Sequence, residues 1–109
     1  MNEPRTYGEE SARDFVLNRA KELINGDRQQ VYGDAATEFT KVADAWRAIF
    51  GWDTYPEQVP QAMAVLKMIR LQNSPRHVDS WIDIAGYTAL GAETAHYQNE
   101  EKRNDSENT

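Results

Sequence analysis

Two charged pairs on neighbouring predicted helices are the residues best suited to chemistry. Lys67 and Arg70 are three residues apart, which places both on one face of a helix. Asp79 and Asp83 are four residues apart and share a face in the same way. The segment 73–76, Asn-Ser-Pro-Arg, predicts a turn between them, so an antiparallel hairpin would bring two cations and two carboxylates to one cleft. This cluster suits either a phosphate and metal site or a pair of buried salt bridges between helices, and the spacing leaves both open.

Four predicted helices must position these side chains, and the first two have clear ends. The first covers residues 11–25, where Ser11 is a suitable N-cap and Gly26 a suitable stop. The second begins after Asp34, its expected cap, and ends at Gly51. Its apolar residues recur at steps of three and four, which indicates an amphipathic helix with one buried stripe. The stripe consists of Phe39, Val42, Ala43, Trp46, Ile49 and Phe50.

The other two helices form the predicted hairpin. The third begins within residues 53–60, where Thr54 and Glu57 have the spacing of a capping box. Pro60 would kink a helix already under way at Thr54, so the regular part can begin as late as Pro60. The fourth helix covers residues 78–97, and its first half is apolar nearly all round. That pattern indicates a central helix with several neighbours, which can include a partner chain.

Chain length and these helices together predict one all-α domain. A chain of 109 residues can bury a single hydrophobic core but not two. We expect a flexible N-terminus over residues 1–9, one helical domain over residues 10–97 and a disordered acidic tail over residues 98–109. No segment alternates clearly enough to predict a strand.

Composition excludes several classes of function. The net charge of −6, from 12 basic and 18 acidic residues, argues against a nucleic-acid-binding protein that neutralises phosphates. The absence of cysteine excludes disulfides, thiolate metal sites and cysteine nucleophiles, so any metal would need carboxylate or histidine ligands. No apolar run approaches the length of a membrane helix, and the N-terminus has no apolar signal core. We therefore expect a cytoplasmic protein without a membrane partner.

The link between the first two helices is a second candidate region. Residues 27–34 carry polar groups outside the apolar pattern, and loops held by rigid helices commonly carry binding groups. Arg28 could contact a phosphate, Tyr32 could stack on a base or sugar, and Gly33 would let the backbone approach a ligand closely. In the structural alternative, Gly33 makes the turn, Tyr32 packs at the helix entry and Asp34 caps the helix. For Asp34 we prefer the cap.

Four short runs of the sequence carry a family resemblance. They are Gly26-Asp-Arg-Gln-Gln-Val-Tyr-Gly-Asp34; Phe39 with Val42-Ala43 and Trp46; Leu66-Lys-x-x-Arg70; and Asp79-Ser-Trp-Ile-Asp-Ile-Ala-Gly-Tyr87. Together they resemble a small family of mostly phage-encoded domains. That family is similar to the all-α nucleoside triphosphate pyrophosphohydrolases, the MazG-like and dimeric dUTPase-like group. The resemblance spans roughly residues 14–95, and for a phage-encoded chain the expected cytoplasm is that of the host cell.

The resemblance implies a four-helix MazG-like bundle completed by dimerisation or tetramerisation, with carboxylates that hold magnesium against a nucleoside triphosphate. In the catalytic families one helix carries Glu-x-x-Glu and the next carries Glu-x-x-Asp. Asp83 matches the last Asp of this pattern, whereas Ser80 stands where the Glu would be and Asp79 lies one residue earlier. Lys67 and Arg70 stand where the first acidic pair would be. A full cage of four carboxylates is therefore absent.

Three hypotheses of function follow from the residues and the resemblance. The first is a nucleotide-processing protein, a magnesium-dependent nucleoside triphosphate pyrophosphohydrolase of phage type that forms a homo-oligomer. The second is a non-catalytic binder that sequesters a nucleotide, and the third is a helical interaction protein that inhibits a host or viral protein. Under the first, the expected site residues are Asp79 and Asp83 as catalytic carboxylates and magnesium ligands, Lys67, Arg70 and Arg28 as phosphate contacts, and Tyr32, Gly33 and Tyr87 as nucleotide contacts.

Overall fold

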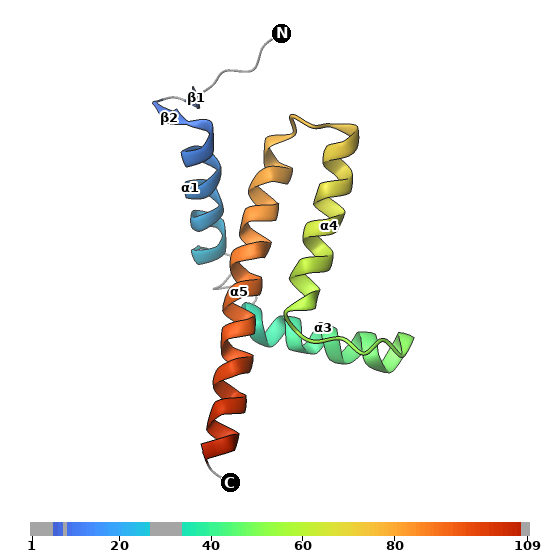
Figure 1. Cartoon of the computed structure of the whole chain (residues 1–109). Coiled ribbons are helices and arrows are strands. Elements are labelled where there is room, and N and C mark those ends of the chain that lie inside the picture. Colours follow the sequence, from blue (N-terminus) through green and yellow to red (C-terminus); the bar gives the residue numbers. More distant parts are fainter. Residues whose placement is uncertain (1–5, 8, 27–33, 108–109) are drawn as a thin grey trace.

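The computed structural model describes residues 6–7, 9–26 and 34–107 and, within them, an all-α protein with four helices. A short antiparallel pair of strands precedes the first helix (Figure 1). The elements in chain order are β1 (Thr6–Tyr7), β2 (Glu10–Ser11), α1 (Ala12–Asn25), α3 (Ala35–Phe50), α4 (Gln58–Asn73) and α5 (Val78–Glu107).

The caps predicted for the first two helices are confirmed. The Ser11 hydroxyl accepts a hydrogen bond from the Asp14 backbone N–H at 3.2 Å, which satisfies one free donor at the start of α1. At the start of α3, the Asp34 carboxylate accepts a hydrogen bond from the backbone N–H of Thr37 at 3.2 Å. Helix α3 ends at Gly51, whose φ of 72° is left-handed and favours glycine.

The start of α4 differs from the predicted capping box. The helix begins at Gln58, whose side-chain oxygen accepts a hydrogen bond from the Tyr55 backbone N–H at 2.8 Å. Glu57 makes no capping hydrogen bond, and the Thr54 hydroxyl instead donates to the Trp52 carbonyl at 3.3 Å. Pro60 is therefore a first-turn residue, where a missing N–H leaves no helical hydrogen bond unmade, so it does not kink the helix.

Helix α5 lies in the middle of the arrangement, as its nearly uniform apolar first half predicts. It packs against α1, α3 and α4, and the α4–α5 contact is the largest (Figure 1). Within the described residues α1 and α4 do not pack on one another, so these three helices form an open layer rather than a closed bundle. Helix α3 crosses one end of the layer. The core cluster lies at this crossing and consists of Phe39, Ala43, Val59 and Leu90, with Ile24, Ala35, Val42 and Trp46 packed against it.

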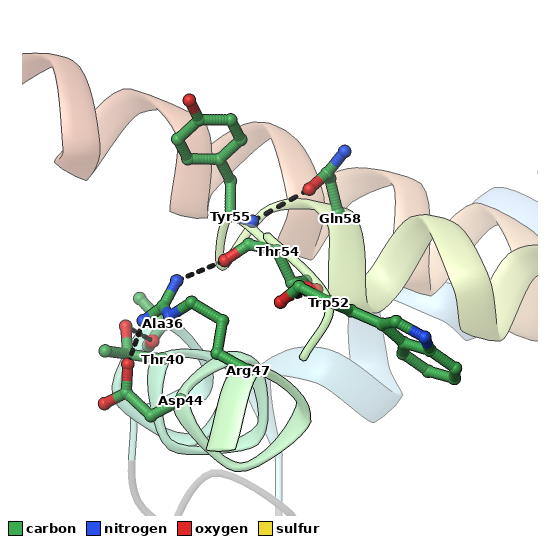
Figure 2. Close-up of polar contacts among 8 residues, drawn as sticks. All are labelled: Ala36, Thr40, Asp44, Arg47, Trp52, Thr54, Tyr55 and Gln58. Carbon is green, nitrogen blue, oxygen red and sulfur yellow. Dashed lines mark hydrogen bonds and ion pairs between the residues drawn. The ribbon is translucent and has the colours of Figure 1, made fainter. Parts of the chain in front are cut away.

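The segment between α3 and α4 is tied back onto α3. The guanidinium of Arg47 donates to the carbonyl of Thr54 and also pairs with the Asp44 carboxylate one turn earlier (Figure 2). Because a charged donor satisfies a backbone acceptor outside any helix, this contact fixes the path of the chain between the two helices. The end of α3 and the start of α4 are thereby held in a defined corner.

Both ends of the chain differ from the sequence prediction. Thr6 pairs with Ser11 and Tyr7 with Glu10 in a strand pair that is too short for alternation to reveal. Helix α5 continues to Glu107, through residues for which we expected a disordered tail. Residues 98–103 include Gln, Glu, Lys and Arg, which favour helix, so an established helix can continue there without apolar contacts. None of the described helices is long and apolar enough to cross a membrane.

Two leucine-to-alanine substitutions, one at a buried and one at an exposed position, test which side chains form the core of this open arrangement. Leu71 is buried on α4, so Leu71→Ala should lower the free energy of unfolding by about 2 to 4 kcal/mol through lost burial and a residual cavity. Leu17 on α1 is 61% exposed, so Leu17→Ala should change the free energy of unfolding by less than about 1 kcal/mol. Urea denaturation followed by circular dichroism measures both. Equal losses in the two variants would contradict the burial described here.

Candidate functional site

Lys67 and Asp83 form an ion pair between α4 and α5. The Lys67 ammonium nitrogen lies 3.0 Å from an Asp83 carboxylate oxygen, and the two side chains are 21% and 35% exposed. Partial burial removes water from both charges, so each is stabilised by the other more than in an exposed pair. The hairpin therefore does bring one cation and one carboxylate of the predicted cluster together.

Arg70 and Asp79 occupy the next positions toward the turn, and both are exposed. Neither makes an ion pair with another residue in the described part of the chain. The described residues also contain no group of three or more His, Asp or Glu side chains that could hold a metal ion. Asp79 and Asp83 thus offer two carboxylates on one face of α5, with one of them already paired to Lys67.

A cleft of about 540 Å³ lies between α1 and α5, and Asp83 is on its wall. This volume is within the range of small-molecule sites, and the walls combine apolar side chains with a few polar groups. We refer to it as the α1–α5 cleft. It is lined by Arg19, Ala20, Glu22, Leu23, Ile24 and Gly26 from the α1 side and by Ile82, Asp83, Gly86, Tyr87 and Leu90 from α5.

Gly86 allows α1 and α5 to approach closely at the cleft. A β-carbon at this position would lie 3.3 Å from a methyl group of Ile24, which is tighter than ordinary contact. Tyr87, a predicted nucleotide contact, follows directly on α5, is half-buried and lines the cleft. The aromatic ring and Asp83 therefore stand on the same wall, one turn apart.

Arg19 and Glu22 on α1 were missed by the sequence analysis. Their side chains lie on the opposite wall of the cleft and form an exposed ion pair at 3.0 Å. The signal that could have identified them is a charged pair three residues apart beside the apolar stripe of α1. A cation, two carboxylates and an aromatic ring consequently border one cavity.

The remaining predicted positions are the three link residues and Ser80. Arg28, Tyr32 and Gly33 lie outside the described residues, so their proposed contacts stay predictions. Ser80, which stands at the position of an expected Glu, is fully buried, and its hydroxyl lies 2.8 Å from Nδ1 of His77. Ser80 lies in the first turn of α5, so this contact is an interaction at the start of the helix, and the buried hydroxyl is not accessible from solvent.

Sequence comparison identifies phage relatives. The family model of a domain of unknown function, DUF6378, matches residues 15–95. The Gene 55 protein of Mycobacterium phage L5 is 40% identical over 76 residues, which cover 69% of this chain and 49% of the relative. The Gene 55 protein of Mycobacterium phage D29 is 29% identical over 72 residues, which cover 66% of this chain and 48% of the relative.

The chain spans about half the length of these curated relatives. No solved structure matches it. The expectation of a small helical domain with phage relatives is confirmed. The resemblance to MazG-like enzymes stays a prediction, because the matched family model describes a domain of unknown function.

A double-mutant cycle should show that Lys67 and Asp83 are coupled. Combining Lys67→Met with Asp83→Asn should yield a coupling energy of about 1 to 2 kcal/mol, between the values of exposed and fully buried pairs. The matched control is the exposed Arg19–Glu22 pair, for which the coupling should stay below about 0.5 kcal/mol. Urea denaturation of the single and double variants measures both. Additive effects at Lys67 and Asp83 would contradict the half-buried ion pair.

Proposed function

This chain belongs to the DUF6378 family, and we propose that it binds a nucleoside triphosphate in the α1–α5 cleft. The observation that carries the proposal is the position of Asp83. Its carboxylate is held by Lys67 on the α4 side and lines the cleft on the α1 side. Lys67 itself does not line the cleft, so a ligand that contacts Asp83 would reach the Lys67 ammonium group only by extending past this carboxylate.

The walls of the cleft suit the two halves of a nucleotide. Leu23 and Ile82 supply apolar surface, and the ring of Tyr87 offers a face on which a base or sugar can stack. Asp83 marks the charged end of the cleft. Lys67, 3.0 Å from Asp83, and Arg70, about one turn further along α4, lie outside the cleft lining, so a triphosphate would have to extend past Asp83 to reach them. Ammonium and guanidinium groups form strong charge-assisted hydrogen bonds with phosphate oxygens.

Asp79 and Asp83, on the same face of α5, are the residues that would hold magnesium, and Lys67, which pairs with Asp83 in the structure, would contact a phosphate oxygen. Two carboxylates do not form a magnesium cage, but together with phosphate oxygens and water they match the usual protein share of such a site. Magnesium would supply neutralisation of the phosphate charge when bound.

We further propose that the bound nucleoside triphosphate is hydrolysed to a monophosphate and pyrophosphate. The chain contributes Lys67 and Arg70, which hold the triphosphate, and Asp83, which orients its charged end beside the wall of the cleft. Asp83 is also the residue that matches the last acid of the MazG-like pattern. Gly26 lines the cleft. The residues that follow it along the chain include Arg28, Tyr32 and Gly33, which would add contacts to the nucleotide under the same hypothesis.

Charge reversal on α4 tests nucleotide binding. Arg70 is exposed, so Arg70→Glu should leave the fold intact while it repels the phosphates. The dissociation constants of ribo- and deoxyribonucleoside triphosphates, measured by isothermal titration calorimetry, should rise about tenfold or more. Lys67→Glu should also raise these dissociation constants. Lys41→Glu is the matched control, since Lys41 is an exposed lysine of α3 that does not line the cleft. Equal effects of the three variants, or no binding across the panel, would rule out the proposed site.

Product analysis tests hydrolysis separately from binding. The protein is incubated with the same nucleotides, with and without magnesium or manganese, and the products are resolved by chromatography. We expect metal-dependent release of monophosphate, which Asp83→Asn abolishes, whereas Asp53→Asn, on the segment between α3 and α4, retains it. Binding without turnover would leave the sequestering binder as the function.

The helical interaction protein has one observation in its favour. Large apolar side chains that do not line the cleft are exposed on α3 and α4. Indifference to every nucleotide, together with an intact fold, would support that hypothesis over nucleotide binding. The two hypotheses differ in the surface they use, so substitutions in the cleft and substitutions of exposed apolar residues of α4, such as Leu66 and Ile69, distinguish them.

A further inference from the structure

A second cavity lies between the start of α1 and the turn that joins α4 to α5. Its volume is about 500 Å³, within the range of small-molecule sites, and it shares no lining residue with the α1–α5 cleft. We refer to it as the α1–turn groove. In Figure 1 the starts of α1 and α5 lie side by side, at the end of the layer away from α3. The nucleotide proposal leaves this groove without a role.

The walls of the α1–turn groove are apolar. Val16 and Leu17 line it from α1, Val78 and Trp81 line it from one face of α5, and Pro75 lines it from the turn. Leu17 is 61% exposed and Trp81 is 50% exposed, so both keep apolar surface in contact with water. A ligand with an apolar body would cover this surface, and its burial would favour binding.

The groove has a defined shape because its aromatic side chain and its turn are both held by hydrogen bonds. The indole N–H of Trp81 donates to the Pro75 carbonyl at 3.0 Å. The backbone N–H of His77 donates to the Ser74 carbonyl at 3.0 Å, which closes the turn. An indole has one donor and no acceptor, so the Trp81 ring offers apolar surface to the groove and no free polar group. A ligand would not have to order these walls on binding.

Two guanidinium groups supply the charge at the groove. Arg13 comes from α1 and Arg76 from the turn, and both side chains are exposed. No carboxylate is among the described residues that line the groove, although the chain has 18 acidic residues and a net charge of −6. Asp14 and Asp79 are close in sequence but are outside the lining, since successive helical residues point about 100° apart. The groove is therefore a local positive site in an acidic protein.

We propose that the α1–turn groove binds a small molecule with an apolar body and one anionic group. The apolar body would lie against Leu17 and Trp81 and shield them from water. The anionic group would accept hydrogen bonds from Arg13 and Arg76, because guanidinium groups form strong charge-assisted hydrogen bonds with oxyanions. A neutral molecule with the same body would gain only the apolar contact, and a cation would be repelled.

This ligand class differs from the nucleoside triphosphate proposed for the α1–α5 cleft. The α1–turn groove combines an apolar interior with two cations and has no carboxylate in its lining that could share a metal with a triphosphate. The further proposal does not depend on nucleotide binding, because the two cavities have separate linings. Substitutions in one lining can therefore be tested for their effect on the other.

Two fluorescent probes that differ in one group test the charge requirement. Anilinonaphthalene sulfonate has an apolar body and one sulfonate, and phenylnaphthylamine has the same body without the sulfonate. In fluorescence titrations of the full chain, we expect saturable binding of the sulfonate, about tenfold tighter than binding of the neutral probe, because the arginines contact only the former. Equal affinities for the two probes, or no saturable binding of the sulfonate, would overturn the proposal.

Charge reversal locates this preference at the arginines. Arg13→Glu and Arg76→Glu should each weaken binding of the sulfonate about tenfold and change binding of the neutral probe less than about twofold. Both positions are exposed, so helical circular dichroism should be unchanged. Lys41→Glu is the matched control, the same change of charge at an exposed position of α3 outside the groove. An equal loss in Lys41→Glu would contradict the assigned site, because it would reflect net charge alone.

The indole signal of Trp81 gives a second, independent readout. The chain has three tryptophans, and Trp81→Phe identifies which indole signal of a proton–nitrogen correlation spectrum belongs to Trp81. Saturation with the sulfonate probe should shift this signal and leave those of Trp46 and Trp52 in place. Shifts confined to Trp46 and Trp52 would overturn the proposal. Arg13→Glu should also leave nucleotide affinity unchanged, so failure of either proposal can be recognised separately.

Discussion

Close packing against α5 holds the described helices together. Within the described residues α1 and α4 do not pack on one another; both pack on α5, and α4 also contacts α3, which crosses the end of the layer. The packing needs small residues on α5, because a β-carbon at Gly86 or Gly91 would lie 3.3 Å from Ile24 or Pro60. Larger side chains there would push α1 and α4 outward. The cleft and the hairpin both depend on these short distances.

The central position of α5 also explains why Asp83 can serve two neighbours. A residue on α5 lies between α1 and α4, so one carboxylate both pairs with Lys67 and lines the cleft beside α1. A closed bundle would surround such a group with protein on all sides. The open layer leaves it about one third exposed, so a ligand can reach it while partial burial strengthens its electrostatic interactions.

Helix α4 differs between its two sides. Its inner side provides Lys67 to Asp83, and its other side carries large apolar residues that are exposed. The absence of acidic residues from α4 favours phosphate binding, because Arg70 has no carboxylate on its own helix with which to pair. In a protein of net charge −6, that absence distinguishes α4 from every other described helix.

The sequence by itself determined the four helices and the starts of α1 and α3, since their caps and turns are local, but not the way in which α4 begins. Ser11, Asp34 and Gly51 act within four residues of their partners, and their roles follow from residue type and spacing. Tertiary structure decided which part of the α3 stripe is covered and that Lys67, rather than Arg70, meets an acid, because both depend on the register between helices. The cleft walls at Arg19 and Glu22 likewise required the packing of α1 on α5, which no local pattern specifies.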